Sequence, residues 1–231
     1  MGKRIDVLTN QLEQDKLDWV ALNPGPSLRY LTGLNFHLME RPVVVLVSSS
    51  GQVKLIMPEL ERAKAASLPF EAEVFLFSDD PAEWQALFAR AMADISPRPL
   101  RVGVEPTRLR FLELSLLREA LPNAEFVDGS AALAGMRMRK SADELRAMRQ
   151  AALIAQNALI NTLTTVKPGQ SERQISSELI VQLYREGSEA ELPFAPIVST
   201  GPNTANPHAS PTDRALREGE MLLIDWGAGF S

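Results

Sequence analysis

Short apolar runs alternate with amphipathic helical patterns along the first 130 residues, and this alternation restricts the fold more than any other feature of the sequence. Four valines and a leucine follow one another at 43–47, a composition typical of a buried strand. Residues 48–51 have turn composition, and a second apolar run at 53–57 completes a predicted β-hairpin. Strands interleaved with helices predict an α/β layered domain.

The other elements of this region follow from the same two patterns. Further strands are predicted at 19–22, 74–77, 102–104 and 126–127, and helices at 4–16, 58–67 and 111–120. One more helix is predicted after Asp80, because this acid is followed by Pro81 at the first helical position and by Glu83 at the third.

A second unit is predicted from residue 136, so the predicted domains are 1–135 and 136–231. Ser141 and Glu144 form the pattern of a capping box, which starts a helix. Apolar side chains then recur at spacings of three and four and predict one buried helix face, made of Leu145, Met148, Ala152, Ala155, Leu159 and Leu163.

A helix pair and two strands make up the rest of this unit. After a break at 167–169, Ser171 begins a second helix, whose predicted inward side chains are Ile175, Leu179 and Leu183. Gly187 is suited to the position just past the end of that helix. Residues 193–199 and 221–226 are strand-like and are joined by a long polar segment.

Composition and charge exclude several kinds of site. The chain has no cysteine, which excludes disulfides, thiolate zinc sites, iron–sulfur clusters and a cysteine nucleophile. With a net charge of −5, the chain lacks the basic character of a nucleic-acid binder. The longest apolar run is about five residues, far below the ~20 of a membrane span, and no secretory signal is recognisable. These features predict a cytoplasmic protein without nucleic-acid or membrane partners.

Asp225 is the most informative polar residue. It follows the run at 221–224, which is apolar on both faces and therefore predicts a strand covered on both sides. A carboxylate at the end of such a strand costs several kcal/mol unless it is paired, hydrogen-bonded or bound to a metal. Two interpretations stay open: an acid that caps the turn at 226–229, or a ligand for a hard divalent cation.

The chain has two histidines, His37 and His208. His208 lies in a loop at 200–211 made almost wholly of turn formers, where it either faces a ligand or is exposed to solvent. His37 has no acid or second histidine at ligand spacing and is interpreted as structural or interfacial. The sequence contains no serine-hydrolase elbow, no His-Glu-x-x-His motif and no P-loop.

Three stretches of the second unit carry a family resemblance. They are MRKSADEL at 138–145, PIVSTGPN at 196–203 with PH at 207–208, and REGEMLLIDWGA at 217–228. In their order and spacing they resemble the entry to the first catalytic helix, the segment of the active-site histidine and the strand of the first metal-binding aspartate in the creatinase, aminopeptidase P and prolidase family of pita-bread metalloenzymes. The first unit, with YLTG at 30–33, is similar to the family's non-catalytic domain.

This resemblance implies an α/β N-terminal creatinase-like domain followed by an incomplete α+β pita-bread catalytic domain. It implies hydrolysis of the bond before proline in a peptide or dipeptide, by a water that two divalent ions (manganese, cobalt or zinc) activate. Asp225 would be one metal ligand. His208 would be a catalytic residue that donates a hydrogen bond or proton to the substrate. The resemblance also implies a cytoplasmic homodimer.

The family's second aspartate, its ligand histidine and its two glutamates have no counterpart within the 231 residues. The chain by itself is therefore expected not to bind the two ions stably and to be inactive, as a fragment, a truncated product or a remnant. Two alternatives are a creatinase-like amidinohydrolase of the same fold and a non-catalytic binding or assembly module.

Overall fold

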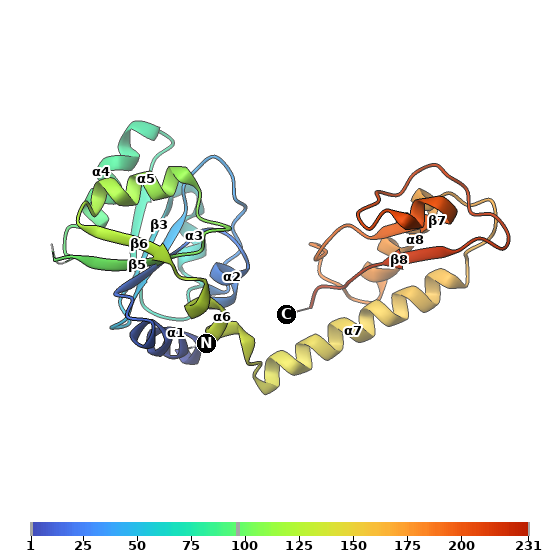
Figure 1. The fold of residues 1–231 in the computed structure, drawn as a ribbon, viewed down its shortest axis with the longest axis horizontal. Coiled ribbons are helices and arrows are strands. Elements are labelled where there is room, and N and C mark those ends of the chain that lie inside the picture. The colour runs from blue at the N-terminus through green and yellow to red at the C-terminus, as the bar shows by residue number, and fades with distance from the viewer. Residues whose placement is uncertain (1, 96–97, 231) are drawn as a thin grey trace. The chain divides into compact units, whose positions relative to one another are not determined.

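The computed structural model describes residues 2–95 and 98–230 and divides the chain into two compact units, Met1–Arg139 and Lys140–Ser231 (Figure 1). The division lies at the end of helix α6, Ser130–Met138, and the predicted boundary at residue 135 falls inside that helix.

The first unit is a mixed six-stranded sheet with helices on both faces. Its strands are β1 (Trp19–Leu22), β2 (Val44–Ser48), β3 (Val53–Pro58), β4 (Glu73–Phe77), β5 (Leu100–Val104) and β6 (Ala124–Asp128). Its other helices are α1 (Gly2–Gln14), α2 (Pro26–Thr32), α3 (Arg62–Ala65), α4 (Trp84–Ala91) and α5 (Phe111–Ala120), with short 3₁₀ turns at Glu59–Glu61 and Pro81–Glu83.

The strand order is β4-β3-β2-β1-β5-β6. The predicted hairpin is confirmed, because β2 and β3 pair antiparallel with Val47 opposite Val53. β1 pairs antiparallel with β2 and parallel with β5, so it lies inside the sheet. The α/β layered architecture predicted for this region is therefore confirmed.

Side chains of β2 alternate between two apolar cores, one on each face of the sheet. Val45 and Val47 pack in the core that contains Leu8 and Leu12 of α1, both fully buried. Leu46 packs in the opposite core with residues of α4 and α5. Figure 1 shows the sheet between α4 and α5 on one side and α1 and α6 on the other.

Two helices of this unit have no counterpart in the predictions. α2 begins at Pro26, directly after Pro24 and Gly25, and ends where Gly33 takes a left-handed conformation with φ of 75°. α6 consists largely of small residues, so it has only a short apolar stripe, of which Ala132, Leu133 and Met136 are buried. The helix start after Asp80 is confirmed, since its carboxylate accepts a hydrogen bond from the backbone N–H of Ala82.

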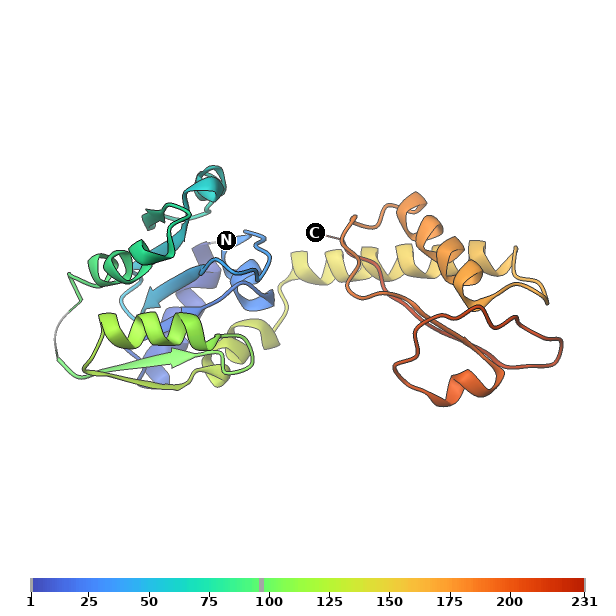
Figure 2. The ribbon, with the colours of Figure 1, turned by 90° about the horizontal axis from the view of Figure 1, so that it is seen from above.

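The second unit packs two helices on one side of a two-stranded ladder (Figure 2). It contains α7 (Ala142–Leu163), α8 (Glu172–Arg185), β7 (Ile197–Thr200) and β8 (Leu222–Asp225), with a 3₁₀ turn at Gly201–Ala205. The predicted capping box at Ser141 with Glu144 is present, and the predicted helix start at Ser171 is also a capping box, with Gln174. The predicted inward residues of α8 are confirmed, because Ile175, Leu179 and Leu183 are buried.

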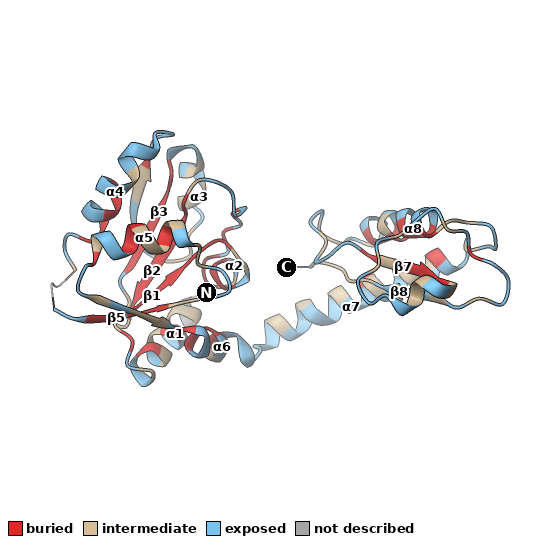
Figure 3. Ribbon diagram, turned by 45° about the horizontal axis from the view of Figure 1, so that its top comes forward, coloured by how far each residue is buried: buried red, intermediate tan, exposed pale blue. Residues whose placement is uncertain are grey.

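The buried face of α7 differs from the predicted one. Ile154, Ala158 and Thr162 are buried, whereas Leu145 and Met148 are exposed. Figure 3 shows α7 largely in the colours of exposed and intermediate residues. Apolar side chains occur on more than one side of this helix, and packing against α8 covers the side that carries Ile154 and Ala158.

No helix in residues 2–95 or 98–230 is both long and apolar enough to cross a membrane.

We expect Gly103→Ala to destabilise the first unit by about 1–3 kcal/mol, because overpacking forces neighbours to shift. A β-carbon at this position would lie 2.9 Å from Leu17 Cδ1 and 3.2 Å from Gly129 Cα. Gly25→Ala is the control, since its β-carbon would meet Arg108 at an ordinary 3.6 Å. Urea unfolding followed through the indole N–H signals of Trp19 and Trp84 measures the difference, and equal stability of both variants would contradict it.

Candidate functional site

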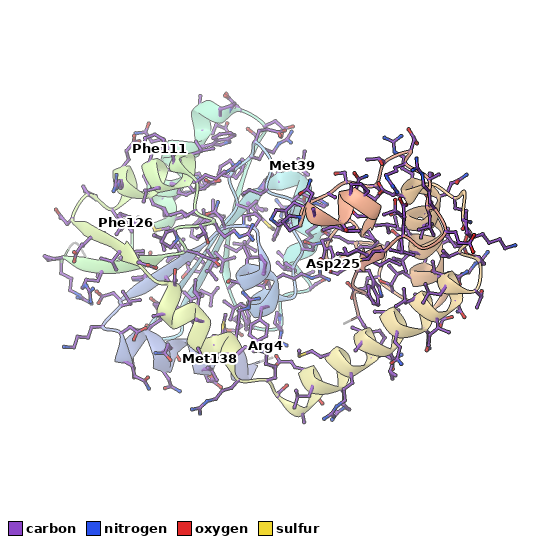
Figure 4. All side chains as sticks on the ribbon, turned by 45° about the vertical axis from the view of Figure 1, so that its right-hand side comes forward. Arg4, Met39, Phe111, Phe126, Met138 and Asp225 are labelled. Carbon is purple, nitrogen blue, oxygen red and sulfur yellow. The ribbon has the colours of Figure 1, made fainter. Side chains whose placement is uncertain are left out.

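Asp225 is the last residue of β8 and lies opposite Ile197 of β7 (Figure 4). β8 is not covered on both sides as the sequence predicted. Leu223 is 36% exposed and Asp225 is also exposed, whereas Leu222 and Ile224 pack against the helix pair. The helices α7 and α8 cover only one face of the ladder. Asp225 lies on the other face, so its carboxylate is in contact with solvent.

The Asp225 carboxylate makes no hydrogen bond or ion pair with any residue that the structure describes. The turn-capping interpretation requires such a bond to the segment at 226–229, so the structure does not support it. The other interpretation, a ligand for a hard divalent cation, stays a prediction, and the exposed carboxylate is compatible with it.

Hydrogen bonds attach the segment after Asp225 to α7 and to the loop that follows α8. Trp226 Nε1 donates a 2.8 Å hydrogen bond to the carbonyl oxygen of Ala155 on α7. The backbone N–H of Gly229 donates to Ser188 Oγ at 3.1 Å, and Glu189 N donates to the Gly229 carbonyl oxygen at 2.9 Å. These contacts fix the end of β8 and therefore the place of Asp225.

His208 lies in the loop that leaves the other end of the ladder. β7 ends at Thr200, opposite Leu222, and the loop continues through the 3₁₀ turn at 201–205. His208 is exposed, and its backbone N–H donates to Asn206 Oδ1 at 3.1 Å. The loop begins beside Leu222, which is three residues before Asp225, or roughly 10 Å along the strand β8. Among the described residues no hydrogen bond joins His208 to Asp225.

Asp225 has the chemistry of one metal ligand but does not make a metal site. A solvent-accessible carboxylate on a fixed strand end suits a hard divalent cation, which prefers oxygen ligands. Within 2–95 and 98–230, however, no three His, Cys, Asp or Glu residues form a group that could hold an ion.

His37 is exposed in the segment between α2 and β2. Arg110, the residue before α5, donates hydrogen bonds to the carbonyl oxygens of Met39 and Arg41 in this segment, and it pairs with the fully buried Glu113. The segment that carries His37 is thus attached to the first unit by Arg110. The interpretation of His37 as structural or interfacial stays a prediction.

Glu172, the first residue of α8, is fully buried, and its side chain accepts five hydrogen bonds from described residues of the second unit. Its Oε1 accepts from Thr200 N at 2.7 Å, Thr200 Oγ1 at 3.1 Å and Asn203 Nδ2 at 2.9 Å. Its Oε2 accepts from Thr212 N at 2.9 Å and Thr212 Oγ1 at 2.6 Å. One carboxylate therefore binds the segments on either side of His208.

The hydrogen bonds decide the ionisation of Glu172. Burial by itself raises the pKa of a carboxyl group, but the bonds from Thr212, Thr200 and Asn203 favour the charged form and lower the pKa of Glu172 to about 2. The carboxylate is consequently ionised throughout the neutral range.

An ion pair extends this network. Arg214 Nη1 donates to Thr200 Oγ1 at 2.6 Å, and the same guanidinium binds Glu220 at 2.5 and 2.8 Å. Hydrogen bonding to Arg214 lowers the pKa of Glu220. Gly201 lies against this pair, where a β-carbon would be 2.7 Å from Arg214 Nη2. The start of the loop is thus held from two sides.

Reasoning from the sequence did not identify Glu172 as part of the site. An acid in the first turn of a helix is common, and its partners Thr200 and Thr212 lie 28 and 40 residues away. A local signal could not have found this cluster.

Comparisons with known proteins agree over both units. Residues 4–139 match the family described as the creatinase/prolidase N-terminal domain, and residues 146–231 match metallopeptidase family M24. An Xaa-Pro dipeptidase of Lactobacillus helveticus is 25% identical over 224 residues, which are 96% of this chain and 61% of the relative.

Solved structures give the same result. The recombinant prolidase of Thermococcus sibiricus superposes with a TM-score of 0.89 at 25% identity, over 99% of this chain and 62% of that protein. A dipeptidase from Pyrococcus horikoshii gives a TM-score of 0.86 at 27% identity, over 98% and 62%. The chain therefore spans about three fifths of the length of these proteins.

We expect Glu172 to stabilise the second unit above pH 4.5 and to lose this effect in acid. Its folded-state pKa of about 2 lies below the usual 4.5, so the stabilisation is complete above the unfolded value and disappears as the pH falls from about 4.5 towards 2. The shift corresponds to a loss on the order of 3 kcal/mol. Urea unfolding followed through the Trp226 indole N–H, at pH 6 and below pH 3, measures it.

Other carboxyl groups titrate in the same range, so the comparison is made with Glu172→Gln, which should lose less stability on acidification than the wild type. Glu218→Gln, at an exposed position, is the control and should behave as the wild type does. An equal loss in all three proteins would contradict the assignment.

Proposed function

Because the chain belongs to the creatinase/prolidase family, we propose that its residues form part of a metal-dependent peptidase that hydrolyses the bond before proline. In this family assignment the first unit is the creatinase-like N-terminal domain and the second is part of the M24 pita-bread domain. The observation that carries the proposal is the free carboxylate of Asp225 at the end of β8, within the region matched by the metallopeptidase family.

The relatives support this reaction class. The matched proteins include an Xaa-Pro dipeptidase and a prolidase, whose names state the bond they cleave. A bond before proline is an imide without an N–H, so peptidases that require this donor handle it poorly. The proposed substrate is a proline-containing dipeptide or short peptide.

Two side chains have proposed roles. Asp225 would supply one carboxylate to a pair of divalent ions, and when bound these ions would supply an acidified water as nucleophile. His208, exposed on its loop, would donate a hydrogen bond or a proton to the substrate as charge develops on the carbonyl oxygen. Asp225 remains accessible to a metal because no described residue occupies its oxygens.

The finer parts of the proposal are manganese, cobalt or zinc as the metal, a homodimer as the assembly and the cytoplasm as the location. The lack of cysteine fits a reducing compartment and a site with oxygen ligands.

We expect the full-length product of the gene to hydrolyse Xaa-Pro dipeptides when manganese, cobalt or zinc is added. In that protein Asp225→Asn should lower kcat/KM at least about 100-fold, through loss of a charged ligand, and His208→Ala should lower it about 10- to 1,000-fold. Glu218→Gln, at an exposed carboxylate outside the site, should leave hydrolysis unchanged. Release of proline from a dipeptide panel is the measurement.

Activity on creatine in place of peptides would favour the amidinohydrolase alternative of the same fold. Absence of hydrolysis with every metal and substrate would overturn the peptidase proposal and favour a non-catalytic binding or assembly module.

Residues 1–231 produced alone should show no manganese-stimulated hydrolysis. One carboxylate cannot offset the dehydration of two divalent ions, and the described part of the chain offers no group of three ligands. Robust cleavage of an Xaa-Pro dipeptide by this protein, abolished by a chelator, would show this reasoning to be wrong. A purified prolidase assayed in parallel confirms that the substrates and metal are competent.

A further inference from the structure

Glu172 holds the two ends of the segment that carries His208. Thr200 and Asn203 precede the histidine and bind Oε1, whereas Thr212 follows it and binds Oε2. The two oxygens of one buried side chain thus bring the entry and the exit of the loop together.

Main-chain contacts place the same helix end against the loop exit. Glu172 N donates to the Arg214 carbonyl oxygen at 3.1 Å, and Arg173 N donates to that of Thr212 at 3.1 Å. The side chain of Arg173 also pairs with Asp213 at 2.8 Å. The first turn of α8 is therefore the support on which the exit of the loop rests.

Over residues 204–210 the hydrogen bonds that the structure gives are short-range, whereas at the exit Arg173 Nε donates to the Pro211 carbonyl oxygen at 3.3 Å. Thr204 Oγ1 donates to the Gly201 carbonyl oxygen at 2.8 Å, and His208 N donates to Asn206 Oδ1 at 3.1 Å. Such contacts shape the loop locally but do not attach it to the rest of the unit. Its position depends on where its ends are fixed.

A carboxylate suits this position better than other side chains. Five N–H and O–H donors point at it, and an ionised glutamate offers two oxygens with about four acceptor sites. Glutamine would place an amide NH₂ against one group of donors and leave them unsatisfied. The guanidinium of Arg214, which also binds Thr200, is the charged group that faces this cluster.

We propose that Glu172 is a positioning residue for His208, which it places by binding Thr200 and Asn203 before the loop and Thr212 after it. This inference rests on the proposed function, in which His208 acts on the substrate. Glu172 itself acts through the loop and not on the reacting atoms.

The test uses the 231-residue chain, in which His208 and His37 are the two histidines and Trp226 reports on the second unit. In Glu172→Gln, hydrogen exchange at the Thr212 and His208 amides should accelerate at least about tenfold, because opening of the loop costs less. The His37 amide and the Trp226 indole signal should stay as in the wild type. Glu178→Gln, on the same helix, is the matched control and should change neither.

A second pair of variants covers the case in which Glu172→Gln unfolds the unit and displaces the Trp226 signal. Thr212→Val keeps the side-chain shape but loses the hydroxyl that binds Glu172, whereas Thr212→Ser keeps it. Faster His208 exchange in the valine variant, with recovery in the serine variant, supports the inference. Unchanged His208 exchange in every variant that keeps a native Trp226 signal would overturn it.

A kinetic measurement separates this inference from the proposed function. In the full-length product of the gene, Glu172→Gln should lower kcat about tenfold or more with little change in KM. The double variant with His208→Ala should have the same kcat as His208→Ala alone. If His208→Ala leaves hydrolysis intact, the proposed role of His208 fails, while the exchange result still decides whether Glu172 positions the loop.

Discussion

The second unit depends on the cost of burying a charge. A carboxylate without solvent is tolerated only when hydrogen bonds replace its water, and Glu172 obtains five of them. Its donors come from the end of β7 and from the segments on both sides of the loop. Because the charged side chain can be buried only with these bonds in place, it requires helix, strand and loop to keep one mutual geometry. The free-energy cost of leaving this one buried carboxylate without hydrogen bonds thus keeps three separate segments together.

The same unit has a ladder with two different faces. Leu222 and Ile224 pack on the helix pair, whereas Leu223 and Asp225 point away from it. Trp226 ties the end of β8 to α7, so Asp225 occupies a fixed place without being buried. Rigid support and solvent access together are what a ligand for a hard cation requires.

Local signals predicted much of the architecture. The hairpin of β2 and β3, the limits of β1 and α5, and the capping box at Ser141 could be read from the sequence, because their interactions join residues a few positions apart. α2 and α6 were missed, since a Pro-Gly segment and a run of small residues are weak helix signals. The prediction of the buried face of α7 was wrong because apolar residues occur on more than one side of the helix, and only packing against α8 selects the side that is covered.

The sequence by itself determined the layered α/β character of the first unit and the helix pair of the second, and it indicated His208 and Asp225 as candidate site residues. These follow from periodicity, capping and residue type, which act over short stretches. Only the tertiary structure decided that one face of β8 is open and that Glu172 joins both ends of the His208 loop. Burial and hydrogen bonding between segments 28 and 40 residues apart arise from packing, and no local pattern encodes them.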